Sequence, residues 1–453
     1  MKNMRLYTLA LVLLGIVISA NAQTLTVLYN FGANSGDPLF PLYAGLLAQG
    51  ADGSLYGTTP LGGTLNDGAV FKVTPEGKMT VLHSFVGGDG DAAFGGLTLG
   101  TDGNFYGTTW YTIFKITSSG QLTTLYTFNG DTDPNGWQPY APPVEGADGN
   151  FYGTTSAGGP DGGGDVYKIT PSGTITRLHS FLVSDGYTAY DALIQGTDGN
   201  FYGTTSQGGS GSVGTIFRIT PAGAFTVLYN FDATHGATPY SSLVQGSDGN
   251  FYGTAEAGGT LGYGVIFKMT PAGNLTVLHN FTGASDGGNP TAGLALATDG
   301  NAYGTTDGGG TLNYGVVFKL TPQSAFSVVN NFDSVHGAFP TTPLIQNTNG
   351  EFYGDTYEGG TASEGTFFSL DIGLGPFVSL VPPSGRVGRV IGILGQGFKG
   401  TTSVSFNGVS ATFNVLSNTC LTATVPKGAA TGLVTVVTPT RTLTSNRKFI
   451  VVP

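Results

Sequence analysis

The sequence predicts an all-β protein: a seven-bladed β-propeller of four-stranded blades, followed by an immunoglobulin-like β-sandwich. Two patterns favour this fold, namely a motif that recurs seven times at nearly constant spacing and, within every repeat, short apolar segments separated by turn residues. Composition agrees, because 76 glycines and only 10% charged residues suit many tight turns and argue against long surface helices.

The recurring motif is Tyr-Gly-Thr-Thr or a close variant. Successive tyrosines are separated by 50, 46, 50, 50, 51 and 50 residues, about the size of one four-stranded propeller blade. The seven tyrosines are Tyr56, Tyr106, Tyr152, Tyr202, Tyr252, Tyr303 and Tyr353.

Each repeat contains four segments of strand length. In the fifth repeat they are residues 242–246, 250–254, 264–270 and 275–281. An Asp-Gly-Asn turn joins the first two segments and a Thr-Pro-x-Gly turn joins the last two, and both favour tight hairpins. Each repeat is therefore expected to form a meander of four antiparallel strands.

The two ends of the repeat array predict how the ring closes. The last repeat stops after its third strand, whereas residues 26–31 match the fourth strand of the fifth repeat, residues 276–281. We therefore expect the N-terminal strand to complete the last blade, which removes the two exposed sheet edges.

These motifs resemble the GloVer tandem repeat of bacterial exported proteins over residues 24–371. The resemblance rests on Asp-Gly-Asn-Phe-Tyr-Gly-Thr-Thr, a Gly-Gly loop, Phe-Lys-x-Thr-Pro-x-Gly and Thr-Val-Leu-x-x-Phe. It implies a secreted or surface-associated propeller, and it carries no catalytic residues that could be transferred to this chain.

After Asp371 the period stops, and a different set of motifs follows. Pro382-Pro383-Ser384-Gly385, residues 393–398, 404–408 and 425–429, and Thr431-Gly432 resemble the IPT/TIG family of immunoglobulin-like domains. The predicted organisation is a propeller over residues 23–371, a linker over 372–375 and the IPT/TIG domain over 376–453. Such a module in exported bacterial proteins implies a spacer or contact role.

The first 22 residues follow the pattern of a signal peptide, with Lys2 and Arg5, an apolar run over residues 9–18, and Ala20-Asn21-Ala22 before a cleavage at Gln23. We expect an exported protein that is secreted, periplasmic or attached to the cell surface, without a membrane span. The formal charge of −11 disfavours nucleic acid as a partner. A lone cysteine, Cys420, excludes an internal disulfide.

Most titratable residues recur at equivalent positions of the repeats, so we interpret them as structural. The histidines form two such columns, the acids of the Asp-Gly-Asn turns form a third, and a set of glutamines on the innermost strand forms a fourth, with Glu145 in one repeat. The glutamines are expected to hydrogen-bond around the central channel. The histidines are His83, His179, His279, His235 and His336; the glutamines are Gln49, Gln195, Gln245 and Gln346.

The second repeat breaks the symmetry. Tyr106 and Phe114 are 8 residues apart, against 15 for Tyr252 and Phe267, and the connection into the third repeat is lengthened. Both connections leave the same face of a propeller, so we expect them to lie side by side.

Both tryptophans of the chain fall in these two connections, each with a tyrosine nearby. Trp110, Tyr111, Trp137 and Tyr140 are therefore the candidate ligand-binding residues, because exposed flat aromatic rings suit stacking on sugars. The alternative is that the tryptophans cover the apolar patch that the shortened connection exposes.

Asp131, Asp133 and Asn135 have the spacing that opens a calcium loop. The later ligand positions are filled by Pro139 and Pro142, so this half loop offers few ligands. Calcium is the only cofactor candidate, and otherwise no cofactor is expected.

We expect a non-catalytic binding or surface-interaction protein, with an extracellular glycan or cell-surface component as its partner. One alternative is an extracellular polysaccharide hydrolase or lyase, and another is a structural surface protein without a single ligand. Catalysis would need titratable groups that break the symmetry, and no pair of these is spaced as a general acid and base. The candidates are Glu145, Asp131, Asp133, Glu256, Asp307 and Glu358.

Overall fold

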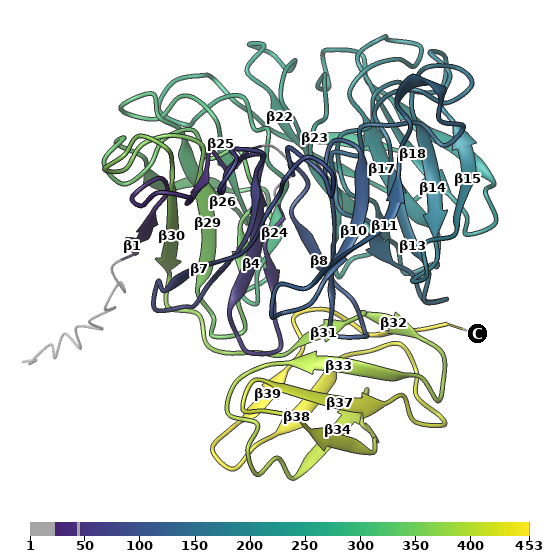
Figure 1. Cartoon of the computed structure of the whole chain (residues 1–453), viewed down its shortest axis with the longest axis vertical. Coiled ribbons are helices and arrows are strands. Elements are labelled where there is room, and N and C mark those ends of the chain that lie inside the picture. Colours follow the sequence, from purple (N-terminus) through teal and green to yellow (C-terminus); the bar gives the residue numbers. More distant parts are fainter. Residues whose placement is uncertain (1–22, 43–45, 453) are drawn as a thin grey trace, which may run out of the picture.

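The computed structural model describes residues 23–42 and 46–452. The predicted signal peptide therefore lies outside the described residues. Seven four-stranded antiparallel sheets, formed between Thr24 and Asp371, are arranged around a common centre, and a smaller β-sandwich lies below them (Figure 1). The number of sheets before residue 372 is the one that the period predicts. No helix among the described residues is long and apolar enough to span a membrane.

Six of the seven sheets follow the predicted meander, with strands in sequence order. Their strands are β3 (Ala48–Gln49), β4 (Leu55–Thr59), β6 (Ala69–Val73) and β7 (Met79–Ser84); β8 (Leu97–Leu99), β9 (Phe105–Thr108), β10 (Thr112–Ile116) and β11 (Leu122–Thr127); β12 (Val144–Glu145), β13 (Phe151–Thr154), β14 (Asp165–Ile169) and β15 (Ile175–Ser180); β16 (Ile194–Gln195), β17 (Phe201–Thr205), β18 (Thr215–Ile219) and β19 (Phe225–Asn230); β20 (Val244–Gln245), β21 (Phe251–Ala255), β22 (Val265–Met269) and β23 (Leu275–Asn280); β24 (Ala295–Leu296), β25 (Ala302–Thr306), β26 (Val316–Leu320) and β27 (Phe326–Asn331). A short two-stranded ribbon of β2 (Pro38–Leu39) and β5 (Leu61–Gly62) lies beside the first sheet.

The seventh sheet closes the ring as predicted. It contains β28 (Ile345–Gln346), β29 (Phe352–Thr356), β30 (Thr366–Asp371) and, as its outer strand, β1 (Thr24–Asn30). β1 pairs antiparallel with β30 from Thr24 opposite Asp371 to Asn30 opposite Thr366. Phe31, directly after β1, is fully buried.

The repeat tyrosines hold neighbouring sheets together. The ring of Tyr106 stacks on Phe151 of the next sheet at a centroid distance of 3.8 Å, and Tyr152 stacks on Phe201 at 4.0 Å. The tyrosine hydroxyl donates to the aspartate of the turn before it, as from Tyr106 to Asp102 at 2.9 Å. The motif thus recurs because each copy packs one sheet on the next and fixes its own turn.

The C-terminal module is a sandwich of two four-stranded sheets, ordered β31-β33-β37-β36 and β35-β34-β38-β39, around a core that includes Phe398, Phe406 and Leu421. A parallel pair of short strands, β32 and β40, completes it. Its strands are β31 (Ser379–Val381), β32 (Ser384–Gly385), β33 (Val390–Leu394), β34 (Ser403–Phe406), β35 (Val409–Ser410), β36 (Phe413–Val415), β37 (Cys420–Thr424), β38 (Val434–Val437), β39 (Thr442–Thr444) and β40 (Ile450–Val451).

Candidate functional site

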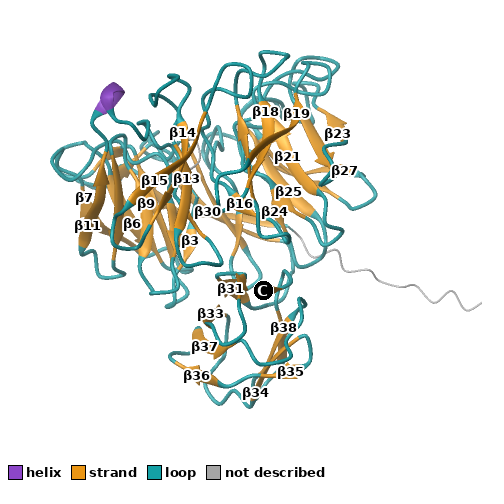
Figure 2. Ribbon diagram, turned by 90° about the vertical axis from the view of Figure 1, so that its right-hand side faces the viewer, coloured by secondary structure: helices purple, strands orange, loops and turns teal. Residues whose placement is uncertain are grey.

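The two irregular connections lie side by side, as the sequence predicts. The shortened one joins β9 to β10, and the lengthened one joins β11 to β12 and begins with the 3-10 helix η1 (Gly130–Thr132). The backbone N–H of Phe128 donates to the carbonyl of Tyr111 at 2.8 Å, which ties the two connections together. Helix η1 lies on the face of the propeller away from the C-terminal module (Figure 2).

The four predicted aromatic residues meet in one chain of ring contacts. Tyr111 and Trp137 are stacked, with centroids 6.0 Å apart and an interplanar angle of 6°. Trp110 lies 6.4 Å from Tyr111 and 6.0 Å from Tyr140. The structure therefore brings together residues that are separated by a complete strand pair in the sequence.

Three further rings extend this chain, and the sequence analysis missed them. Phe94 lies 5.5 Å from Trp110 and 5.3 Å from Tyr140. Tyr140 contacts Tyr190 at 4.8 Å, and Tyr190 contacts Tyr240 at 5.2 Å. The sequence contains a signal for them. In four consecutive repeats an aromatic residue stands five positions before the position that the innermost-strand glutamines occupy. We call the complete set the aromatic arc: Phe94, Trp110, Tyr111, Trp137, Tyr140, Tyr190 and Tyr240.

The members of the arc differ in how they are anchored. Tyr111 is 39% exposed, and the other members are half-buried. Trp137 also packs against the buried cluster of Phe128 and Tyr167, so part of its surface serves the core. Within the described residues, neither tryptophan Nε1 has a hydrogen-bond partner. Both Nε1 atoms are buried, so the packing alternative applies in part to both tryptophans, whereas Tyr111 is exposed.

Two carboxylates of the predicted set, Glu256 and Asp307, directly follow β21 of the fifth sheet and β25 of the sixth sheet. The hydroxyl of Thr238 lies 3.5 Å from Glu256 Oε2. Burial raises the pKa of Glu256, and the charge of Asp307 raises it further. Burial likewise raises the pKa of Asp307, and Glu358 adds to this shift. Asp307 thus lies close enough to Glu256 and to Glu358 for like charges to raise carboxyl pKa values.

Glu358 also lines a cavity of about 440 Å³. Tyr314, Val335 and Ala338 supply apolar surface there, and Ser334 and Thr361 supply polar atoms. This volume is in the range of small-molecule pockets.

The calcium candidates are engaged in closing their own loop. Asp133 accepts hydrogen bonds from the Tyr126 hydroxyl at 2.9 Å, from the Asn129 N–H at 3.0 Å and from the Asn135 N–H at 2.9 Å. The side chain of Asp131 lies outside what the structure describes. Across residues 23–42 and 46–452, no three His, Cys, Asp or Glu side chains form a group that could hold a metal ion.

The same loop closure recurs in other sheets, and it accounts for the first histidine column. His83, His179 and His279 contact Asp89, Asp185 and Asp286 at 2.8, 3.2 and 3.1 Å, as Tyr126 contacts Asp133. Each aspartate also accepts a backbone N–H of its loop, for example from Val86 to Asp89 at 3.0 Å. These three histidines are half-buried in this contact, as predicted. His235 and His336 of the second column are instead exposed, and each lies 2.8 Å from the aspartate three residues before it.

The glutamine column links neighbouring sheets around the centre of the ring. Gln195 Oε1 accepts from the N–H of Ala147 at 3.1 Å, and Gln245 Oε1 accepts from the N–H of Thr197 at 2.8 Å. Glu145 does the same for Thr101 at 2.8 Å. The predicted hydrogen-bonding role is confirmed, and in five of the seven sheets the bond reaches the sheet before it. The second and sixth sheets have Leu99 and Leu296 at this position.

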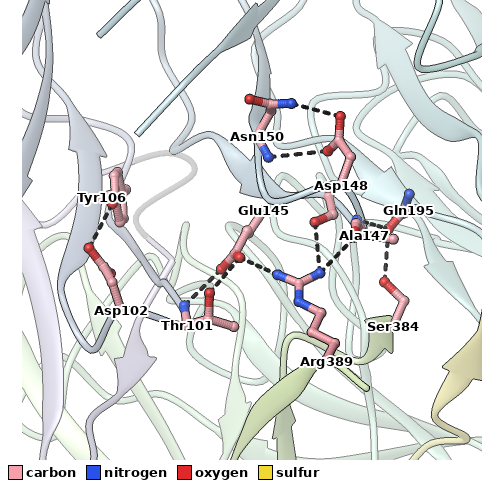
Figure 3. Close-up of polar contacts among 11 residues, drawn as sticks. Thr101, Asp102, Tyr106, Glu145, Ala147, Asp148, Asn150, Gln195, Ser384 and Arg389 are labelled. Atoms are coloured by element: carbon pink, nitrogen blue, oxygen red, sulfur yellow. Dashed lines mark hydrogen bonds and ion pairs between the residues drawn. The ribbon is translucent and has the colours of Figure 1, made fainter. Parts of the chain in front are cut away.

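Glu145 has a second partner that the sequence analysis did not foresee. Arg389 of the C-terminal module donates to Glu145 Oε1 at 2.6 Å and to the carbonyl of Ala147 at 2.8 Å (Figure 3). Ser384 of the same module donates to Gln195 Oε1 at 3.0 Å. The C-terminal module therefore docks on the face opposite η1, and Glu145 is one of the residues that hold it there.

Similar proteins agree with this architecture. The family model of the Gloeobacter/Verrucomicrobia repeat matches residues 14–133, 110–313 and 239–402, and that of the IPT/TIG domain matches residues 377–449. No curated protein matches the chain.

Among solved structures, a streptogramin B lyase is 16% identical, with a TM-score of 0.54, and the match covers 77% of this chain and 97% of that one. The extracellular domain of a one-component system from B. thetaiotaomicron is 12% identical, with a TM-score of 0.49 over 82% of this chain and 46% of that one. At such identities the likeness to the lyase shows the fold alone. The family matches span most of the sequence, so the chain belongs to the Gloeobacter/Verrucomicrobia repeat family and carries an IPT/TIG domain at its C-terminal end.

Proposed function

We propose that this protein is an exported, non-catalytic binding protein that takes an extracellular glycan on the aromatic arc. The proposal includes a signal peptide over residues 1–22, the propeller over 23–371, a linker over 372–375 and the IPT/TIG domain over 376–453. The observation that carries it is the continuous chain of ring contacts from Trp137 to Tyr240. Trp137 belongs to the connection that begins with η1, on the face that the IPT/TIG domain leaves uncovered (Figure 2).

The physical argument is that aromatic rings stack on the apolar faces of sugars. Rings held in place by their neighbours lose little conformational entropy on binding, and Tyr and Trp are enriched where interfaces concentrate their binding energy. Contacts at 4.8 to 6.4 Å between successive rings make the arc an extended, pre-organised surface that suits a chain of sugar units.

The test is a glycan array followed by calorimetry with the best ligand. Tyr111→Ala and Tyr190→Ala should weaken binding about tenfold or more, because each removes one stacking ring. Tyr263→Ala is the matched control, since Tyr263 is 46% exposed and lies outside the arc. The melting temperature of each variant separates loss of binding from loss of folding. Equal binding by the arc variants and the wild type would contradict the proposal.

Calcium enters the same experiment. Array binding is measured with added calcium and with a chelator, because Asp131, Asp133 and Asn135 remain a candidate half loop. The loop-closing hydrogen bonds of Asp133 favour binding that does not depend on calcium.

A polysaccharide hydrolase or lyase remains the second candidate, because Glu256 and Asp307 are neighbouring carboxyl groups with raised pKa values. Product formation in a hydrolase and lyase screen, lost in Glu256→Gln, would favour this function over simple binding. A protein that binds no glycan and turns over no substrate would match the structural alternative.

A further inference from the structure

We infer that the C-terminal module binds an acidic polysaccharide, a flexible chain whose sugar units carry negative charge. The site lies on a different module from the aromatic arc, so the inference goes beyond the function proposed above and does not depend on it. It is carried by the charge of the module, by the positions of its exposed basic side chains, and by a cavity with an arginine in its wall.

The two modules carry opposite charge. Residues 23–371 contain 28 acidic and 8 basic residues, whereas residues 376–453 contain 7 basic residues and no aspartate or glutamate. Lysine and arginine stay protonated at neutral pH, so the C-terminal module attracts anions although the whole chain has a charge of −11. Its basic residues are Arg386, Arg389, Lys399, Lys427, Arg441, Arg447 and Lys448.

Most of these basic side chains are not used to hold the two modules together. Arg389 pairs with Glu145 at 2.6 Å, and its side chain is only 18% exposed. Five others are exposed and form no ion pair within residues 23–42 and 46–452; they are Arg386, Lys399, Lys427, Arg441 and Lys448. Because the module has no acid of its own, these charges are available to an anionic partner.

Arg386 and Lys427 lie on adjoining turns at one end of the module. The turn that contains Arg386 precedes β33, and the turn that contains Lys427 follows β37. The N–H of Gly388 donates to the carbonyl of Val425 at 2.9 Å, and this bond joins the two turns. The two positive charges therefore belong to one end of the sandwich.

Lys399 and Arg441 form a second pair beyond the other end of β33. A Cβ atom added at Gly400 would lie 2.9 Å from the ring of Pro439, so the two turns that contain these basic residues touch. Between the two pairs, the five residues of β33 span about 16 Å. A small anion cannot reach both pairs, whereas a polymer with repeated charges can contact them together.

A cavity of about 520 Å³ lies at the Arg386 end. Arg386, Val387, Val451 and Val452 line it, and Val387 is 48% exposed. A guanidinium group binds a carboxylate through two parallel hydrogen bonds, and the valines offer apolar surface to the face of a sugar ring. This combination suits one acidic sugar unit of a longer chain.

The arrangement of the molecule favours a flexible partner. Arg386 and Lys399 flank β33, which lies between the propeller and β34 (Figure 1). A flat lipid surface that approached from the side of β34 would meet the far sheet of the sandwich before these ends. A DNA duplex is stiff over about 150 base pairs and would run past the module beside the acidic propeller. A flexible chain can follow the module alone.

The experiment compares two ligands of equal length that differ in charge: an oligogalacturonate and its fully methyl-esterified form. Calorimetry is performed at about 0.1 M and about 1 M salt, where the screening length falls from about 10 Å to about 3 Å. Duplex DNA and vesicles of phosphatidylglycerol and phosphatidylcholine are measured beside them. The variants are Arg386→Gln, Lys427→Gln, Lys399→Gln, Arg441→Gln and the combination of all four.

Two further variants are the controls. Lys78→Gln removes an exposed positive charge from the β6–β7 turn of the propeller, and Tyr190→Ala removes a ring of the aromatic arc. The melting temperature of every variant is measured to exclude loss of folding. Sedimentation at both salt concentrations reports self-association.

We expect the oligogalacturonate to bind the wild type at low salt, and the esterified form to bind at least about tenfold more weakly. High salt should remove most of this preference. Each single substitution in the module should weaken binding about twofold to fivefold, and the combined variant about thirtyfold or more. Lys78→Gln and Tyr190→Ala should leave the affinity unchanged.

Equal binding of the charged and esterified forms would contradict the inference, as would full affinity in the combined variant. Tighter binding of DNA or of the vesicles would show that the partner belongs to another class of molecule, and binding of none of the four would also overturn the inference. Salt-sensitive self-association that the combined variant abolishes would assign the basic side chains to the acidic propeller of a second copy. The glycan array with the arc variants decides the proposed function separately.

Discussion

At the scale of single residues, Asp165 shows how a departure from the repeat creates a local cost. It begins β14, where the corresponding strands of three other sheets begin with Thr112, Thr215 and Thr366 and those of the remaining three begin with Ala69, Val265 and Val316. It is fully buried, and neither carboxylate oxygen has a hydrogen-bond partner within the described residues. Burial raises the pKa of Asp165 to about 6, an effect that the nearby Ser180 hydroxyl and Arg177 only partly offset.

We predict that Asp165→Thr stabilises the protein at neutral pH by about 2 kcal/mol and changes little at about pH 4. An acid with a raised native pKa binds more protons folded than unfolded, so its contribution to stability falls as pH rises from the unfolded pKa to the native one. Urea unfolding of both proteins at the two pH values measures the difference. A variant that is less stable than the wild type at neutral pH would show that Asp165 has a stabilising partner.

The variant must be compared with the wild type at each pH, because other buried acids change the stability with pH in the same direction as Asp165. Burial raises the pKa values of Asp191 and Asp355 to about 7. Their shared effect cancels in the difference between the two proteins, and only the effect of Asp165 remains.

At the scale of elements, β1 is the strand on which the closed ring depends. It pairs with β30 over its whole length, and Phe31 after it is fully buried beside Phe71 and Phe367. No other described strand can complete the seventh sheet, because β30 ends the repeat array. Without β1, β30 would expose a row of unpaired backbone groups.

We predict that deleting residues 24–31 lowers the free energy of unfolding by at least about 3 kcal/mol, since burial of one phenylalanine alone is worth roughly 1.5–3 kcal/mol. The matched control is the chain that begins at Thr24, which keeps β1. Thermal unfolding measures the loss, and light scattering reports the aggregation expected from an open edge. An unchanged melting temperature would mean that β1 does not hold the ring closed.

The elements also show what the sequence could predict. Strand number, turns and ring closure follow from residues that act locally: Asp102 fixes its own turn, and the repeat tyrosine packs on the next sheet. The approach of Trp110 and Trp137 was predictable as well, because loop length and meander geometry decide it. Phe94 and Tyr240 were missed because an aromatic column looks the same whether it packs inside a sheet or lines a surface.

At the scale of the whole molecule, the contact between Glu145 and Arg389 was beyond the reach of sequence reasoning. The two residues are 244 positions apart and belong to modules with separate motifs. In the sequence, Glu145 is a glutamate at the position where four other repeats have a glutamine. In the structure the substitution supplies a negative charge at the point where the C-terminal module presents an arginine.

This contact divides the molecule into a covered face and a free face. Besides Arg389, Thr419 donates to the carbonyl of Ala51 at 2.7 Å and Gln396 donates to Thr348 at 3.1 Å. These contacts involve turns of three different sheets, so they fix the C-terminal module over the centre of the ring. Helix η1, which begins the connection that contains Trp137, lies on the other face (Figure 2).

We predict that Glu145→Gln loosens this docking while leaving the ring intact. A glutamine at this position still accepts the N–H of Thr101, as Gln195 accepts that of Ala147 at 3.1 Å, but it leaves the mostly buried Arg389 guanidinium without a counter-charge. The substitution should make docking of the C-terminal module less favourable by about 1–3 kcal/mol. Small-angle scattering should show a larger radius of gyration, and residues 372–375 should become more sensitive to proteases.

A double-mutant cycle with Arg389→Met isolates the pair, because a real contact makes the two substitutions non-additive. Glu76→Gln controls for the change in net charge. Additive effects with an unchanged scattering curve would show that the remaining backbone contacts hold the domain alone. Glycan binding is the second readout. If the proposed glycan site lies away from the docked module, Glu145→Gln should release the C-terminal module without changing ligand affinity. A site between the two modules would instead lose affinity.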